Sequence, residues 1–229
     1  MDGIFTSAII VAAGNSTRMG YKQTKQLISL IGRPAVEYTI KAFQNCQFID
    51  EIVVVARSTD IEDVAKVAFN FGKVTSVTAG GNTRMESVAR GVKACSRCAT
   101  HYAIHDGARV MITPVQIENV LEEGYRSGAA TLATPVTDTI KIVDEKGLIV
   151  STPDRSTMWA VQTPQVFEKE LYKRALKNAM ENNISVTDDC SMVEALGETV
   201  HTVLGNYSNI KLTTPVDITI AEALLSKRK

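Results

Sequence analysis

The sequence has no long hydrophobic run and no excess of charge of either sign. Its longest purely apolar stretches, such as Ala8–Ala13 and Ile52–Ala56, are far shorter than the roughly 18 residues that a membrane-spanning helix needs. No cationic segment precedes a signal-type apolar region. The 25 basic and 25 acidic side chains cancel, which argues against general binding to nucleic acid or to an acidic membrane. We therefore expect a cytoplasmic protein without a membrane or nucleic-acid partner, in which any anion site is local.

Cysteines are also few. The four are Cys46, Cys95, Cys98 and Cys190, and the Cys95-Ser-Arg-Cys98 segment has neither a second such pair nor a nearby pair of histidines to complete a zinc site. We expect structural or incidental thiols. What the chain does contain is 45% hydrophobic residues, which is ample for a packed core.

Short β-branched segments alternate with longer segments of helical periodicity. The predicted strands are Ser7–Ala12, Glu51–Ala56, Val74–Thr78, His101–His105, Ala129–Pro135, Met158–Val161 and Thr199–Leu204, and the predicted helices are Ala35–Asn45, Asp60–Phe69, Arg84–Cys95, Pro114–Arg126, Glu168–Glu181, Cys190–Leu196 and Val216–Ser226. This alternation predicts an α/β fold with a mostly parallel, twisted sheet. The first strands are apolar on both faces, as expected where helices cover each side of the sheet. No repeat or linker divides the chain, which favours a single domain over residues 1–229.

One segment, residues 136–157, does not fit this alternation. Alternating residues over Thr139–Val143, a turn at Asp144–Gly147 and the apolar Leu148–Val150 predict a β-hairpin. It has few apolar residues to bury against the main sheet. Because an isolated two-stranded hairpin is only marginally stable, it either projects as an arm onto another subunit or stands in solvent, and the residues leave both readings open.

Three loops that follow predicted strands carry the groups best suited to bind phosphate. The first, Ala12–Gly20, leads on to Lys25, and its small residues let backbone N–H groups approach phosphate oxygens. Arg18 offers a planar fork, and Lys25 offers a compact charge for a developing negative oxygen. The spacing matches neither the dinucleotide-binding nor the P-loop glycine pattern. A solvated loop with incidental cations is the alternative.

The second loop is the glycine turn Gly80–Arg84, with Ser87 following Arg84 on the same side of a helix. Its free N–H groups and the Ser87 hydroxyl suit the edge of a base. The alternative is that Gly80 and Gly81 only close a turn.

The third loop, His105–Arg109, places the Asp106 carboxylate at the end of a strand. Asp106 suits one oxygen ligand of Mg²⁺, which takes its other ligands from water and substrate phosphates. Arg109 can hold a phosphate nearby, or Asp106 caps the next turn and pairs with Arg109. We expect His105 to be a packed histidine. Because carboxyl ends of parallel strands share one edge of a sheet, the three loops should meet at one rim.

Seven ordered motifs over nearly the whole chain resemble those of the 2-C-methyl-D-erythritol 4-phosphate cytidylyltransferase family. They are Ala12-Ala13-Gly14…Arg18-Met19…Lys25-Gln26, Gly80-Gly81…Arg84…Ser87-Val88, His105-Asp106-Gly107-Ala108-Arg109, Asp138-Thr139-Ile140-Lys141, Gln162-Thr163-Pro164-Gln165, Thr187-Asp188-Asp189 and Asn209-Ile210-Lys211-Leu212-Thr213. The resemblance implies a Rossmann-like nucleotidyltransferase fold. It also implies transfer of CMP from CTP to 2-C-methyl-D-erythritol 4-phosphate in the non-mevalonate isoprenoid pathway, with release of pyrophosphate.

The resemblance further assigns roles to individual residues. Arg18, Lys25 and Lys211 would be catalytic, Asp106 would bind Mg²⁺, Ala12, Ala13, Gly14, Gly80, Gly81, Ser87 and Ala108 would bind the nucleotide, and Arg109, Thr139, Arg155, Thr163 and Thr187 would bind the sugar phosphate. A homodimer formed through the arm would place Thr139 and Arg155 in the neighbouring subunit's site. A ribitol 5-phosphate cytidylyltransferase and a non-catalytic nucleotide-binding module remain alternatives.

The sequence departs from the usual family pattern at four positions. Ser16 stands where a second loop glycine is frequent, Thr24 where a proline commonly precedes the lysine, Asn82 where an acid is frequent, and Val110 where a proline is common. None of these removes a charged group that the chemistry requires. Ser16 narrows the range of φ open to the loop.

Overall fold

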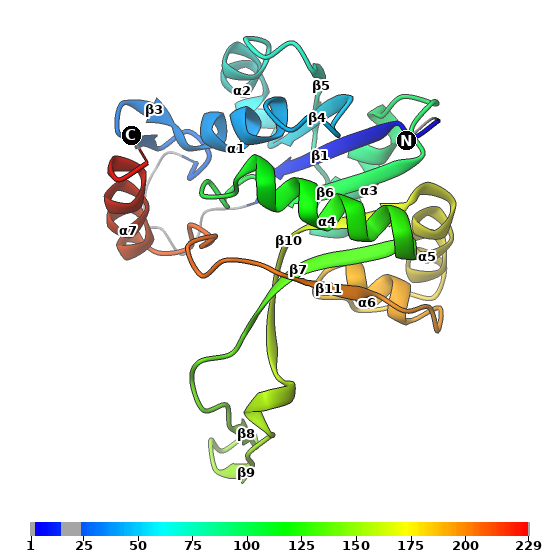
Figure 1. Cartoon of the computed structure of the whole chain (residues 1–229), viewed down its shortest axis with the longest axis vertical. Coiled ribbons are helices and arrows are strands. Elements are labelled where there is room, and N and C mark those ends of the chain that lie inside the picture. Colours follow the sequence, from blue (N-terminus) through cyan, green and yellow to red (C-terminus); the bar gives the residue numbers. More distant parts are fainter. Residues whose placement is uncertain (1–2, 15–23, 229) are drawn as a thin grey trace.

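A seven-stranded sheet forms the centre of the molecule (Figure 1). The computed structural model describes residues 3–14 and 24–228. The strand order is β11-β7-β10-β6-β1-β4-β5, with β1 (Thr6–Ala12), β4 (Glu51–Ala56), β5 (Val74–Ala79), β6 (His101–Asp106), β7 (Ala129–Pro135), β10 (Trp159–Glu168) and β11 (His201–Leu204). All neighbouring pairs are parallel except those of β10, which runs antiparallel to β6 and β7. The predicted mostly parallel sheet is confirmed.

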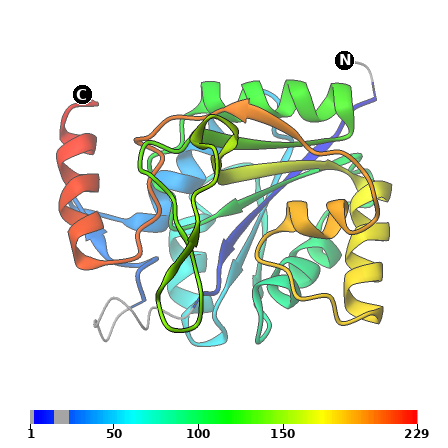
Figure 2. The same ribbon diagram turned by 90° about the horizontal axis from the view of Figure 1, so that it is seen from below.

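Helices cover both faces of this sheet. On one face lie α1 (Ala35–Gln44), α2 (Ile61–Ala68), which follows the short η2 (Ser58–Asp60), and α4 (Pro114–Ser127); on the other lie α3 (Arg84–Ala94), α5 (Lys169–Glu181) and α6 (Asp189–Glu194). Figure 2 shows α4 and α6 on opposite sides of the sheet. Along β1, Ala8 and Ile10 pack in the first layer and Ile9 in the second, all fully buried. Strands apolar on both faces therefore reflect two helical layers.

A third apolar cluster joins the carboxyl-terminal helix to a small hairpin. Helix α7 (Pro215–Ser226) packs near β2 (Ser29–Leu30) and β3 (Arg33–Pro34). The sequence did not predict this hairpin. Its turn residues Ile31 and Gly32 have φ values of 46° and 79°, and isoleucine is uncommon where φ is positive. The usual turn signal of asparagine or aspartate before glycine is missing.

The predicted elements agree with the observed ones to within a few residues, except at β10. We predicted a strand over Met158–Val161, whereas β10 continues to Glu168. Its register on β7 shifts between Val161 and Gln165, so the ladder skips Pro164, which has no N–H to donate. The prediction was wrong about the length because the second half of the strand begins beyond this irregularity.

The residues between β7 and β10 form an arm that projects away from the sheet (Figure 1). It contains β8 (Ile142–Val143), β9 (Ile149–Ser151) and the single turn η3 (Arg155–Thr157). The predicted hairpin is thus confirmed, and the choice between an arm that contacts another subunit and a hairpin in solvent stays a prediction. We find no helix among the described residues that is long and apolar enough to cross a bilayer.

Candidate functional site

A cleft of about 770 Å³ lies at the rim where β1, β4, β5 and β6 end. Its lining includes the predicted residues Ala13, Gly14, Lys25, Gly80, Gly81, Ser87, Asp106, Ala108 and Lys211. The three loops therefore meet at one edge, as the parallel strands predicted. The side chain of Ala12 packs in the core beneath the cleft. Arg18 and the divergent Ser16 lie outside the described residues.

The glycine turn approaches the first loop too closely for a side chain. A Cβ at Gly80 would lie 2.3 Å from the Ala13 Cβ and 2.8 Å from the Ser87 Oγ. The Ser87 hydroxyl accepts a hydrogen bond from the Gly81 N–H at 3.1 Å and donates one to the Thr83 carbonyl at 2.8 Å. Ser87 therefore holds the shape of the turn that forms one wall of the cleft.

Asp106 is the centre of a cluster of charges on the floor of the cleft. Its carboxylate lies 2.7 Å from the Lys211 Nζ, 3.5 Å from the Arg84 Nε and 3.9 Å from the Arg109 Nε. Burial alone would raise the pKa of the Asp106 carboxyl, but the Lys211 ammonium and the Arg84 guanidinium hold this pKa well below its ordinary value. The suggested pairing with Arg109 is present but is the longest of the three. Asp106 is thus a permanently charged anchor for cations from three separate segments.

A second cleft of about 480 Å³ adjoins the first. The two clefts share Arg84, Asp106 and Lys211. The second cleft is also lined by three residues predicted to bind the sugar phosphate, Arg109, Thr163 and Thr187. Two phosphorylated molecules, one in each cleft, would therefore meet at the same charged groups.

His105 is packed, as expected. It is fully buried, its Nδ1 is hydrogen-bonded to the Thr163 Oγ at 2.9 Å, and its Nε2 faces the Arg109 carbonyl at 3.3 Å. The ring lies 5.0 Å from that of Phe43. Burial lowers the pKa of His105 to about 3, so the imidazole is neutral at physiological pH and braces the strand that ends at Asp106.

The segment that carries Lys211 is tied down by a buried amide. Asn209 is fully buried, and its Nδ2 donates to the Gln162 Oε1 at 3.0 Å and to the Thr163 carbonyl at 3.1 Å. Arg109 donates to the Asn209 carbonyl at 2.7 Å. Further along, the Lys25 Nζ donates to the Leu212 carbonyl at 3.0 Å. Hydrogen bonds thus link the segment that carries Lys211 both to Lys25, which follows the first loop, and to β10 at the base of the arm.

Several groups that shape the site could not be assigned a role from the sequence. The sequence places Arg84 only on a helix face, and Asp189 and Asn209 only within motifs. Asp189 lies 2.6 Å from Arg84 although 105 positions separate them. A buried carboxylate or amide carries no local sequence signal for its partner, so only the fold could bring these residues together.

Asp106 fits Mg²⁺ only in a particular way. Within residues 3–14 and 24–228, no three histidine, cysteine, aspartate or glutamate side chains form a metal-binding group. Asp106 is the one acidic side chain among the described residues that line the first cleft. Since Mg²⁺ is often held by one or two carboxylates together with waters and substrate phosphates, this donor set suits a metal ion that arrives with a nucleotide.

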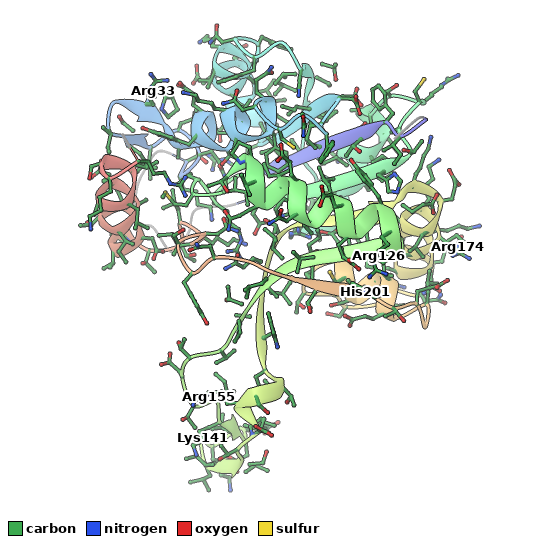
Figure 3. All side chains as sticks on the ribbon, viewed as in Figure 1. Arg33, Arg126, Lys141, Arg155, Arg174 and His201 are labelled. Carbon is green, nitrogen blue, oxygen red and sulfur yellow. The ribbon has the colours of Figure 1, made fainter. Side chains whose placement is uncertain are left out.

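Two predicted residues lie away from the clefts. Thr139 and Arg155 are on the arm, and neither is among the described residues that line either cleft. Figure 3 shows Arg155 on the arm, far from the sheet, where it donates to the Thr137 carbonyl at 3.0 Å. Within one chain, therefore, they are not part of the site.

Comparisons with known proteins agree with this geometry. The family model of 2-C-methyl-D-erythritol 4-phosphate cytidylyltransferase matches residues 6–227. A protein of that name from Caldanaerobacter subterraneus is 42% identical over 224 residues, which cover 96% of this chain and 99% of the relative.

Solved structures are similar over nearly the whole length. The 4-diphosphocytidyl-2C-methyl-D-erythritol synthase of Anaerococcus prevotii has a TM-score of 0.89 at 32% identity and covers 98% of this chain and 100% of its own. The 2-C-methyl-D-erythritol 4-phosphate cytidylyltransferase of Thermus thermophilus has a TM-score of 0.79 at 30% identity, with 97% and 100% covered. The Rossmann-like fold expected from the motifs is confirmed.

Proposed function

Because the chain belongs to the 2-C-methyl-D-erythritol 4-phosphate cytidylyltransferase family, it is a cytidylyltransferase, and we propose that its two clefts bring CTP and 2-C-methyl-D-erythritol 4-phosphate together. The observation that carries this proposal is the pair of adjoining clefts that share Arg84, Asp106 and Lys211. CTP occupies the larger cleft and the sugar phosphate the smaller one. The products are 4-diphosphocytidyl-2-C-methyl-D-erythritol and pyrophosphate.

The reaction needs no protein nucleophile. A phosphate oxygen of the sugar phosphate is anionic near neutral pH, because its second pKa is about 6. It attacks the α-phosphorus of CTP, a new P–O bond forms, and the bond between the α-phosphorus and the bridging oxygen breaks to release pyrophosphate. The work of the protein is to hold two anions that repel one another and to stabilise the charge that moves onto pyrophosphate.

Cations on both sides of the junction supply that stabilisation. Lys25 and Arg18 act on the triphosphate, and Lys211 acts from the junction, where its Nζ lies 2.7 Å from Asp106. A Mg²⁺ ion bound by Asp106 and the phosphates would add positive charge there. The side chains of Arg109, Thr163 and Thr187 orient the sugar phosphate in the second cleft.

The nucleoside is held by the walls of the larger cleft. Ala12, Ala13 and Gly14 from the first loop, Gly80, Gly81 and Ser87 from the second, and Ala108 from the third surround it. Five of these residues besides Ala108, namely Ala13, Gly14, Gly80, Gly81 and Ser87, line the larger cleft, and their small size supports this assignment, because backbone groups can then approach the nucleoside closely. Ser87 holds the turn.

The arm completes a neighbouring subunit's site in a homodimer. Apolar side chains along the arm, including Leu148, Ile149 and Val150, are about two-thirds exposed, and such surfaces favour protein contact. Thr139 and Arg155 would then reach the sugar phosphate of the neighbour. This arrangement gives a role to two residues that line neither cleft of their own chain.

A pyrophosphate-release assay tests the proposal. With CTP, Mg²⁺ and methylerythritol phosphate, pyrophosphate should be released, and ATP, UTP or GTP should replace CTP poorly. Ribitol 5-phosphate in place of methylerythritol phosphate tests the alternative acceptor. Chelation of Mg²⁺ should abolish turnover and its return should restore it. Pyrophosphate release with ribitol 5-phosphate but not with methylerythritol phosphate would contradict the proposed acceptor. Turnover that survives chelation would contradict the proposed metal.

A further inference from the structure

Arg84 occupies an unusual place, at the boundary between the two clefts. It is the first residue of α3, whose N-cap Thr83 accepts a hydrogen bond from the Glu86 N–H. Its side chain is 30% exposed and lines both clefts. The guanidinium lies 2.6 Å from the Asp189 carboxylate through Nη1 and 3.5 Å from the Asp106 carboxylate through Nε. Protein carboxylates therefore engage N–H donors on two of the three guanidinium nitrogens, Nη1 and Nε, and the others of the five N–H donors are left for a ligand.

Asp189 holds Arg84 from below the cleft. Its side chain is fully buried, and its second oxygen, Oδ1, accepts a hydrogen bond from the Tyr172 hydroxyl at 2.7 Å. Its backbone N–H donates to the Gln165 Oε1 at 3.0 Å. Gln165 in turn donates to the Asp188 carboxylate at 2.7 Å. Hydrogen bonds that do not involve Arg84 thus hold both the backbone and the carboxylate of Asp189.

Tyr172 fixes the carboxylate from within the core. It is fully buried, and its ring lies 5.2 Å from that of Phe167 and 6.0 Å from that of Tyr102. Burial and the neighbouring Asp189 raise the pKa of the Tyr172 hydroxyl well above its ordinary value, so it remains a hydrogen-bond donor. A phenol locked by aromatic packing leaves the Asp189 carboxylate little freedom to rotate.

We infer that Tyr172 and Asp189 are positioning residues, which hold the Arg84 guanidinium at the junction of the two clefts so that its remaining donors face the phosphate groups of both substrates. This inference rests on the proposed function. The chain of bonds runs from the core to the junction and ends on a cation that both substrates must approach. Catalysis of this kind depends on donors that are fixed before the charge develops.

A single-atom change with a matched control tests the role of Tyr172. Tyr172→Phe removes only the hydroxyl that holds Asp189, and Tyr102→Phe makes the same change on a neighbouring buried ring of the same cluster. We expect Tyr172→Phe to lower kcat about tenfold, since a charge-assisted hydrogen bond is lost. Tyr102→Phe should leave kcat within about twofold. An unchanged kcat in Tyr172→Phe would overturn the inference.

A double-mutant cycle separates positioning from a loosened core. If Tyr172 acts through Arg84, adding Tyr172→Phe to Arg84→Ala should lower kcat by no more than about twofold beyond Arg84→Ala alone. If it acts by loosening the core, the two losses multiply, and the inference is overturned. Should Arg84→Ala fail to fold, Arg84→Lys serves in its place, because lysine keeps the charge but loses the fork.

A measurement without turnover keeps this inference separate from the proposed function. The Nε–H signal of Arg84, identified by its loss in Arg84→Lys, should show greater mobility by ¹⁵N relaxation in Tyr172→Phe than in Tyr102→Phe. Equal mobility would overturn the positioning role even in an active enzyme. Absence of cytidylyl transfer by the unaltered protein, with the mobility difference present, would overturn the proposed function and leave the anchoring of Arg84 established.

Discussion

The cleft and the arm differ in which kinds of side chain they bury and which they expose. At the junction of the clefts, Asp106 and Asp189 are buried charges, and each has a cation within hydrogen-bond distance. On the arm, Leu148 and Val150 are apolar side chains that are 64% and 66% exposed. The junction of the clefts buries charged groups, which water solvates strongly, whereas the arm exposes apolar groups, which water solvates poorly.

This difference indicates which region is complete within one chain. A buried charge is costly unless a partner compensates it, and within the cleft the partners come from the same chain. An exposed apolar segment gains free energy when another surface covers it. The charged cluster of the body is therefore compensated within one chain, whereas the arm carries the apolar surface that we propose forms a dimer interface.

Replacing Lys25 should give the largest effect, because it breaks the charged site directly. Lys25→Ala should lower kcat by roughly 100- to 1,000-fold, the scale expected when one positioned electrostatic donor is lost. Lys177→Ala, on an exposed lysine 3.8 Å from Glu181, is the control and should leave kcat unchanged. Steady-state pyrophosphate release measures both, and thermal unfolding shows whether each variant is folded. Normal turnover in Lys25→Ala would remove this lysine from the mechanism.

Mixed dimers test whether the arm completes its partner's site. Arg155→Ala should chiefly raise KM for the sugar phosphate, and Lys25→Ala should be nearly inactive. In a one-to-one mixture with free exchange, half of the dimers pair the two variants, and each of these has one intact site. At a sugar phosphate concentration near the normal KM and far below the raised one, we expect about one quarter of normal activity per subunit, because in the proposed symmetric dimer each arm lies at the other's cleft.

The two variants carry tags of different size, and sedimentation analysis must show that mixed dimers form. If they form and the activity is only the sum of the separate variants, Arg155 serves its own chain or none. The arm would then differ from the cleft in exposure alone, without a function across the interface.

Gly80→Ala probes the close packing of the cleft wall. A new Cβ would lie 2.3 Å from the Ala13 Cβ, so we expect a loss of about 1–3 kcal/mol in the free energy of unfolding and a higher KM for CTP. Gly72→Ala is matched, since a Cβ there would meet no atom within 4 Å, and it should not destabilise the protein. Urea unfolding measures the stability of both variants. Equal stability would show that the cleft wall shifts to accommodate the new Cβ.

His105 makes the body sensitive to acid in a way that the arm is not. Burial lowers its pKa from 6.5 to about 3, so between these values the unfolded chain binds a proton that the folded chain excludes. The free energy of unfolding should therefore fall as pH falls, by about 1.4 kcal/mol per pH unit from this group. Unfolding of His105→Gln between pH 6 and pH 4 should show a slope smaller by that amount. Parallel profiles for the two proteins would contradict the buried neutral imidazole.

The sequence predicted the rim of the cleft better than its interior. Strand ends followed by glycine, arginine and aspartate placed the first, second and third loops at one edge, because parallel strands leave no other arrangement. The anchoring of Arg84 by Asp189 and Tyr172 could not be predicted, since residues so far apart in sequence meet only through the packing of α5 and α6. The hairpin was predicted from its alternating residues and its turn, but neither its direction nor the surface that it contacts could be predicted.

We expect the smallest effect from a substitution on the arm. Asp144 at the tip is exposed and accepts hydrogen bonds from the Lys146 and Leu148 N–H groups, each at 2.9 Å. Glu51 in the body is 5% exposed and accepts from Ser7 and Thr75. The same chemical change, carboxylate to amide, can therefore be made in both regions.

Asp144→Asn should change the free energy of unfolding by less than about 0.5 kcal/mol, because water replaces an exposed acceptor. Glu51→Gln should cost about 1–3 kcal/mol, because its new N–H group would face buried donors. Urea unfolding at low protein concentration measures both without help from a partner chain. An equal loss in the free energy of unfolding for Asp144→Asn and Glu51→Gln would show that the arm folds as one cooperative unit with the body. Its exposed apolar side chains would then not indicate a region that needs a partner for stability.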